Sequence, residues 1–169
     1  TTTHSYSSAA SDVYKRQDSI IDGKCAYEYR KEFGKQLAIE TDIESDIVVP
    51  VPDSGVAAAL GYSEMSKKKF ELGLIRNHYV GRTFIEPTQK IRSFGVKLKL
   101  SSTRSIIENK KIILIDDSLV RGTTCLKIVK MLYNAGAKEV HVRIACPEIK
   151  FPDFYGCLLY TSPSPRDQL

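Results

Sequence analysis

The chain has 169 residues, of which 42% are hydrophobic, and this is enough for one domain with a substantial buried core. Its net charge of +5 is modest, and its basic residues are scattered among acidic ones, so we expect no nucleic-acid partner. No stretch approaches the roughly 18–20 apolar residues that cross a bilayer, so we expect no membrane partner either. A positive net charge also suits a small, highly anionic substrate.

The two ends of the chain differ in composition from the middle. Residues 1–17 are rich in Ser and Thr and lack the apolar centre of a signal peptide. Residues 157–169 place two prolines among serines and charged residues, a composition that does not continue a packed element. Both segments resemble translated library-adaptor sequence, so we expect non-native or disordered tails. The domain is then expected to occupy residues 18–156.

Four cysteines, at positions 25, 125, 146 and 157, form no Cys-x-x-Cys pair. Their spacing indicates neither a zinc site nor a redox motif. The simplest interpretation is reduced thiols, as in a cytoplasmic protein.

The middle of the chain alternates between helical and extended patterns. In chain order, these predict a helix over 26–40, a strand and turn over 46–55, a helix over 55–68, a strand over 71–75, a strand over 111–115, a helix over 123–137 and a strand over 139–145. The stretch 76–104 has no sustained apolar period, and loops of this length are often functional. Unbroken aliphatic strands between helices predict an α/β fold, with a mainly parallel sheet covered by helices on both faces.

The strand "KIILI" ends at two adjacent carboxylates, Asp116 and Asp117. Ligands of open parallel sheets bind beyond the carboxyl ends of the strands, where these two residues lie. The next residues, 118–124, offer backbone N–H groups, hydroxyl groups and a guanidinium beside the start of a helix, which favours a phosphate. Carboxylates beside a phosphate site suit the hydroxyl groups of a pentose 5-phosphate. The alternative is that Asp117 or Ser118 caps the helix and Asp116 is solvated.

The segment "IILIDDSLVRGTT" (112–124) resembles the phosphoribosyl pyrophosphate (PRPP) motif of type I phosphoribosyltransferases. Its Arg-Gly-Thr-Thr ending resembles one branch, the glutamine PRPP amidotransferases. Further similarity to that branch lies in residues 18–23, 51–64, 77–87 and 136–156. The resemblance implies a type I phosphoribosyltransferase fold. It also implies transfer of ammonia to PRPP, which gives 5-phosphoribosylamine and pyrophosphate in the first step of purine biosynthesis.

The resemblance also implies roles for individual residues. Asp116 and Asp117 would hold the ribose, and the 5-phosphate would lie against Ser118, Leu119, Val120, Arg121, Gly122, Thr123 and Thr124. The pyrophosphate end would lie at Asp53, Ser54 and Gly55, with Ser54, Asp116 and Asp117 around Mg²⁺. Residues 76–100 would form a mobile lid, in which Arg82 and Lys97 contact the diphosphate and Tyr79 binds substrate.

Simpler interpretations of these segments stay open on the sequence alone. The 50–55 segment has the composition of an ordinary Pro/Gly turn, and 76–100 that of a solvated charged loop. We expect His141, within a predicted strand, to be a packed core residue.

The chain departs from the family at three places. The glutaminase domain would precede residue 18, so this chain is expected to use free ammonium at best, instead of ammonia from glutamine. The resemblance also implies a further C-terminal stretch after Gly156, which we expect this chain to lack. Asp153 stands where members with an iron–sulfur cluster have a cysteine ligand, so we expect no cluster.

The resemblance further implies a homo-oligomer in the full enzyme and inhibition by purine nucleotides. Two other functions stay open, a nucleobase phosphoribosyltransferase and a PRPP or nucleotide sensor without activity.

Overall fold

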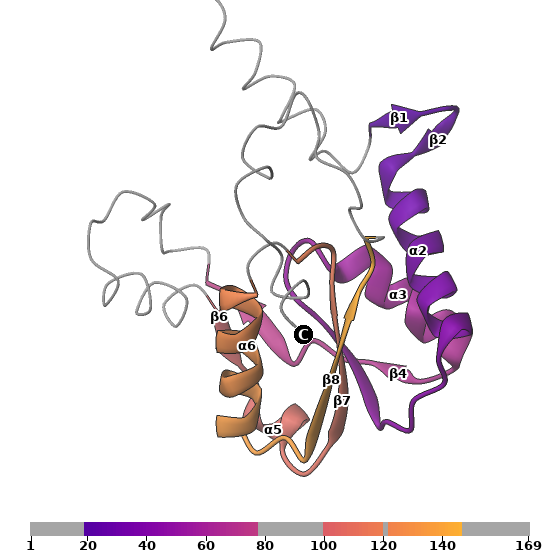
Figure 1. Cartoon of the computed structure of the whole chain (residues 1–169). Helices are drawn as coiled ribbons and strands as arrows, with labels where there is room; N and C mark the ends of the chain where they lie inside the picture. The colour runs from indigo at the N-terminus through magenta and orange to yellow at the C-terminus, as the bar shows by residue number, and fades with distance from the viewer. Residues whose placement is uncertain (1–18, 78–99, 120–121, 147–169) are drawn as a thin grey trace, which may run out of the picture.

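The structure, a computed structural model, describes residues 19–77, 100–119 and 122–146 (Figure 1). Its strands are β1 (Ile20–Ile21), β2 (Lys24–Cys25), β3 (Ile47–Pro50), β4 (Lys69–Phe70), β5 (Leu74–Arg76), β6 (Leu100–Ser102), β7 (Lys111–Asp116) and β8 (Glu139–Ile144). Its helices are α2 (Ala26–Glu40), α3 (Val56–Ser66), α5 (Arg104–Ile107) and α6 (Thr123–Asn134). The predicted domain bounds and both tails extend beyond these residues and stay predictions.

Four strands form a parallel sheet in the order β4-β3-β7-β8. The central strands β3 and β7 are aliphatic without interruption because both of their faces are buried. Their register pairs Ile47 with Ile112 and Pro50 with Ile115. The carboxyl ends of β3 and β7 therefore lie side by side, and the loops that follow both strands meet at one edge of the sheet.

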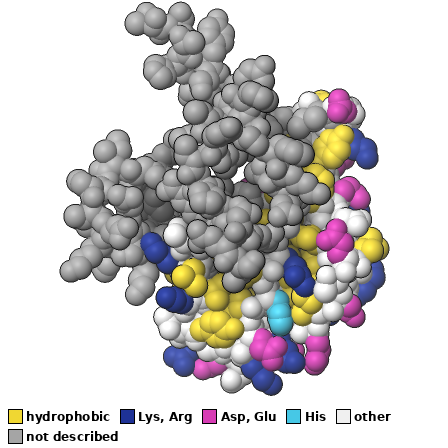
Figure 2. Space-filling view, in the orientation of Figure 1, with side chains coloured by type: hydrophobic (Ala, Val, Ile, Leu, Met, Phe, Trp, Pro, Cys, Tyr) yellow, Lys and Arg dark blue, Asp and Glu magenta, His cyan; other side chains and the backbone are white. Residues whose placement is uncertain are grey.

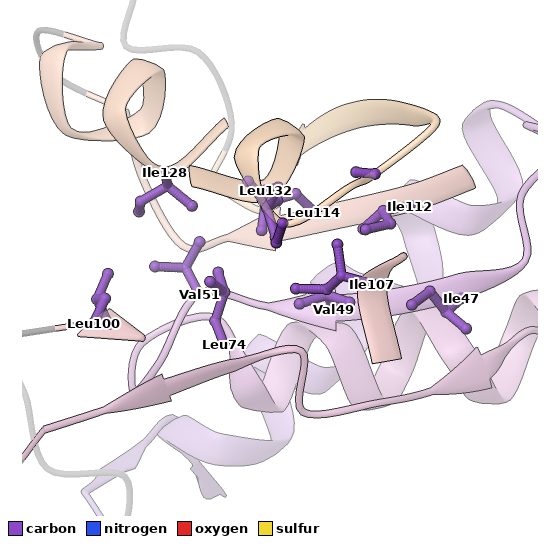
Figure 3. Close-up of a cluster of buried hydrophobic side chains, with 12 residues drawn as sticks. Ile47, Val49, Val51, Leu74, Leu100, Ile107, Ile112, Leu114, Ile128 and Leu132 are labelled. Atoms are coloured by element: carbon purple, nitrogen blue, oxygen red, sulfur yellow. The ribbon is translucent and has the colours of Figure 1, made fainter. Parts of the chain in front are cut away.

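Each face of the sheet is covered by helices. On one face, Val49 and Leu114 pack with Ile128 and Leu132 of α6 and with Ile107 of α5 (Figure 3). On the opposite face, α3 packs directly on the sheet and α2 packs against α3 (Figure 1). Alternate residues of β7 supply these two cores, as expected from the two-residue period of a strand. The predicted mainly parallel sheet with helices on both faces is confirmed.

The segment after α3 differs from the prediction of a single strand over 71–75. It contains β4, which pairs with β3, and β5, which pairs antiparallel with β6 in a separate sheet. The Gly73 N–H donates to the Glu71 carbonyl at 2.9 Å, and this tight turn takes the chain from one sheet to the other. β6 lies within the stretch predicted to lack regular structure, because its three residues are too few to produce a periodic pattern.

The structure also bears on the expected environment of His141 and on the distribution of surface charge. His141 is not a core residue, because β8 is an edge strand and its side chains are only half-buried. The His141 Nε2 lies 3.4 Å from Glu139 Oε2.

On the face shown in Figure 2, Lys and Arg side chains are interspersed with Asp and Glu. Within 19–77, 100–119 and 122–146, no helix has the length and apolar character needed to span a bilayer.

Candidate active site

The two aspartates lie at the carboxyl end of β7, where the backbone is fixed by β8. Asp116 is the last residue of the strand, and its carbonyl accepts from the Ala145 N–H at 2.9 Å. The Asp117 carbonyl accepts from the Cys146 N–H at 2.8 Å. Both carboxylates therefore start from a backbone that the sheet holds in place.

The Asp116 carboxylate links the loop after β3 to the loop after β7. Its Oδ1 accepts from the Asp117 N–H at 2.9 Å and from the Ser54 hydroxyl at 3.2 Å. Burial raises the pKa of Asp116 to about 6, the Asp117 N–H opposes this shift, and the negative charge of Asp117 adds to it. A half-buried carboxylate next to a second carboxylate is unfavourable for folding, and such groups are typical of functional sites.

The structure contradicts helix capping as the explanation of the acidic pair. Helix α6 begins at Thr123, its N-cap is Gly122 with φ of 67°, and no side chain caps it. Asp117 instead accepts from the Ser118 hydroxyl at 3.3 Å. Among the residues that the structure describes, the N-cap of α6 therefore supplies no side-chain cap, and the positive end of the helix dipole lies after the two carboxylates in the chain.

The Pro/Gly turn after β3 packs against the end of β7. The Val51 N–H donates to the Ile115 carbonyl at 2.8 Å, and the Gly55 N–H donates to the Val51 carbonyl at 2.9 Å. A Cβ atom on Gly55 would lie 2.3 Å from the Ile115 carbonyl oxygen, so only glycine permits this approach. This packing brings Ser54 to Asp116, which lies 62 positions away in the sequence.

An ion pair that the sequence did not indicate lies at the same turn. Arg76 Nη1 donates to Asp53 Oδ2. Arg76 is the last residue of β5, so this contact links the β5–β6 sheet to the turn after β3. Sequence reasoning placed Arg76 only within a long polar stretch, and its partner depends on the path of the chain through β4 and β5.

Several predicted site residues lie outside the described part of the chain. These are Tyr79, Arg82, Lys97, Val120 and Arg121. Asp153, which stands where members with an iron–sulfur cluster have a cysteine ligand, also lies outside it. Their roles stay predictions. The structure does bring Ser54 to Asp116, and it packs Gly55 against Ile115, the residue before the acidic pair.

The donor atoms at this edge are suited to a hard cation. Ser54, Asp116 and Asp117 offer only oxygen, which Mg²⁺ prefers, and Mg²⁺ is commonly held by one or two carboxylates together with substrate phosphates and water. Among the residues that the structure describes, no group of three or more His, Cys, Asp or Glu side chains could hold a metal ion. The oxygen atoms of Ser54, Asp116 and Asp117 are nevertheless of the type that Mg²⁺ prefers.

Comparison with known proteins defines the class of protein. The sequence model described as phosphoribosyl transferase domain matches residues 31–148, and the chain belongs to this family. Within the family, the chain is similar to amidophosphoribosyltransferases. It is 60% identical over 143 residues to the enzyme of Rhizobium etli, covering 85% of this chain and 29% of the relative. The chloroplastic enzyme of Glycine max is 58% identical over 139 residues, covering 82% of this chain and 24% of the relative.

A solved structure supports the same assignment. Glutamine PRPP amidotransferase from B. subtilis, complexed with ADP and GMP, has a TM-score of 0.74 and 52% identity, covering 84% of this chain and 31% of that one. The predicted type I phosphoribosyltransferase fold and the predicted resemblance to the amidotransferase branch are confirmed. The chain spans less than a third of the length of each of these relatives.

Proposed function

We propose that the edge formed by the turn 51–55 and the loop after β7 binds PRPP. The hydrogen bond from Ser54 to Asp116, at 3.2 Å, carries this proposal because it joins the two loops beside one carboxylate pair. Asp116 and Asp117 accept hydrogen bonds from the ribose hydroxyl groups. The 5-phosphate lies against residues 118–124 and the first N–H groups of α6. The turn after β3 holds the pyrophosphate end, with Asp53, Ser54 and Gly55 nearest to it.

The proposed reaction displaces pyrophosphate from PRPP by ammonia and gives 5-phosphoribosylamine. Ser54, Asp116 and Asp117 would hold a Mg²⁺ ion, which would supply Lewis-acid stabilisation of the departing diphosphate. The chain itself orients the sugar and needs no covalent nucleophile. Burial, with the nearby Asp116 charge, raises the pKa of the Cys125 thiol, which keeps this cysteine protonated and unreactive.

The comparisons favour the amidotransferase reaction over the two other functions. Identity of 60% over 143 residues supports a shared substrate, while nucleobase transfer has no specific observation in its favour. Ammonia would come from glutamine in the longer enzyme, and this chain would use free ammonium. The B. subtilis relative was solved with ADP and GMP, which supports purine nucleotides as inhibitors of the full enzyme. A homo-oligomer and a cytoplasmic location stay part of the proposal.

The first test is pyrophosphate release from PRPP, Mg²⁺ and ammonium by the wild-type chain and by Asp117→Ala. We expect the variant to lose at least 10-fold in rate, because a charged group that hydrogen-bonds the ribose contributes about 1.5–3 kcal/mol. Asp42→Ala serves as the control, since Asp42 is an exposed carboxylate that pairs with Lys68 away from this edge. Equal rates for wild type and Asp117→Ala would refute the assigned role.

Isothermal titration with PRPP separates an enzyme from a sensor. We expect the wild-type chain both to bind PRPP and to release pyrophosphate from it. Binding without release in the presence of ammonium would indicate a sensor module on the same fold.

A further inference from the structure

The ion pair between Arg76 and Asp53 lies at the same edge of the sheet, and the proposed function gives Arg76 no role. Asp53 lies in the turn after β3, and Arg76 reaches it from β5, which belongs to a different sheet. The side chain of Arg76 is 49% exposed and that of Asp53 is 58% exposed. Exposed ion pairs of this kind contribute little to folding stability, so stability does not explain the contact.

The turn is already held without this ion pair. The Val51 N–H bonds to the Ile115 carbonyl, and the Ser54 hydroxyl bonds to Asp116. Asp53, however, places a negative charge in the turn where the proposed function places a diphosphate. An unopposed carboxylate there would repel the ligand, and Arg76 supplies the neighbouring positive charge.

We infer that Arg76 is a positioning residue for the diphosphate end of the substrate. It acts through Asp53, whose negative charge it neutralises at the turn where the proposed function places the diphosphate. This inference rests on the proposed function, because it assumes that a diphosphate binds at the turn 51–55. It predicts an effect that depends on the diphosphate and is absent for a ligand that lacks it.

The test is isothermal titration of the 169-residue chain with PRPP and, separately, with ribose 5-phosphate, both in the presence of Mg²⁺. We expect Arg76→Ala to weaken PRPP binding by roughly 3- to 10-fold, the size of one lost charge at a partly solvated site. Ribose 5-phosphate should bind both proteins equally. Arg76→Lys should keep PRPP affinity within about 2-fold, because the charge remains. Arg104→Ala, which removes an exposed arginine paired with Glu108, is the matched control and should change neither affinity.

A second substitution shows whether Arg76 acts through Asp53. If it does, adding Asp53→Asn to Arg76→Ala should restore PRPP affinity to within about 2-fold of wild type, since no charge is left unopposed. An affinity that stays low in the double variant would mean that Arg76 contacts the ligand directly and would overturn the inference.

Other outcomes distinguish this inference from the proposed function. Unchanged PRPP binding in Arg76→Ala, with a wild-type chain that binds, overturns the inference alone. Equal loss for PRPP and ribose 5-phosphate also overturns it, because that result indicates a general structural role. A wild-type chain that binds neither ligand overturns both the inference and the proposed function.

Discussion

Replacing Asp116 with asparagine is expected to stabilise the folded chain at neutral pH and to remove most of its affinity for PRPP. The amide keeps an oxygen that can accept from the Asp117 N–H and the Ser54 hydroxyl, so the local geometry is retained. It removes the half-buried negative charge beside Asp117. Loss of a charged hydrogen-bond acceptor should weaken PRPP binding by roughly 10- to 100-fold.

The gain in stability should depend on pH. Burial raises the pKa of Asp116 to about 6 in the folded chain, against 3.8 when exposed. The folded state therefore holds the proton more tightly, and the wild type loses stability as pH rises from about 4 to 6 and stays less stable above it. Because this side chain keeps some contact with solvent, we expect a gain of about 1–2 kcal/mol for Asp116→Asn at pH 7.5. At pH 4 the gain should vanish.

Chemical denaturation at both pH values, without Mg²⁺, measures this difference. Glu139→Gln, a partly exposed carboxylate of β8 near Lys111, is the control and should show no gain at pH 7.5. An Asp116→Asn variant that is less stable than wild type at pH 7.5 would show that the carboxylate serves the fold and not a ligand.

Replacing Gly61 with alanine should lower the melting temperature substantially, although alanine is the better helix former. A Cβ atom on Gly61 would lie 1.9 Å from the Lys31 carbonyl oxygen of α2, and one on Gly34 would lie 1.8 Å from the Ala58 carbonyl oxygen of α3. Both obstacles are backbone atoms, so the two helices would have to separate. Overpacking of this kind costs about 3 kcal/mol, or roughly 10 °C in melting temperature.

The sign of this effect makes the test decisive. Helix propensity alone predicts that Gly61→Ala stabilises the chain by about 1 kcal/mol. Gln36→Ala, at an exposed position of α2, is the control and should change stability by less than about 0.5 kcal/mol. Thermal unfolding followed by circular dichroism measures all three proteins. A Gly61→Ala chain as stable as wild type would contradict the close packing of α2 on α3.

The helices and central strands could be predicted because their patterns are local. The predicted helix over 26–40 has the bounds of α2, and the predicted helix over 55–68 contains α3. The aliphatic run before Asp116 is β7. The short strands could not be predicted, since β4 and β5 owe their existence to partners in β3 and β6 and not to their own two or three residues.

The residue pattern predicted the candidate site in its parts, and only the family resemblance implied that Ser54 lies with Asp116 and Asp117. The acidic pair and the Pro/Gly turn each stood out in the sequence. Their contact through Ser54 depends on the pairing of β3 with β7, which brings the two loops together. Arg76 was missed because its partnership with Asp53 depends on the turn at Gly73 and on the separate β5–β6 sheet.

A crystal structure of the chain grown with Mg²⁺ and PRPP tests the central claim most directly. We expect the ribose hydroxyl groups on Asp116 and Asp117, the 5-phosphate against residues 118–124, and the diphosphate at the turn 51–55. PRPP bound at any other place, or an acidic pair that faces away from the bound sugar, would contradict the account.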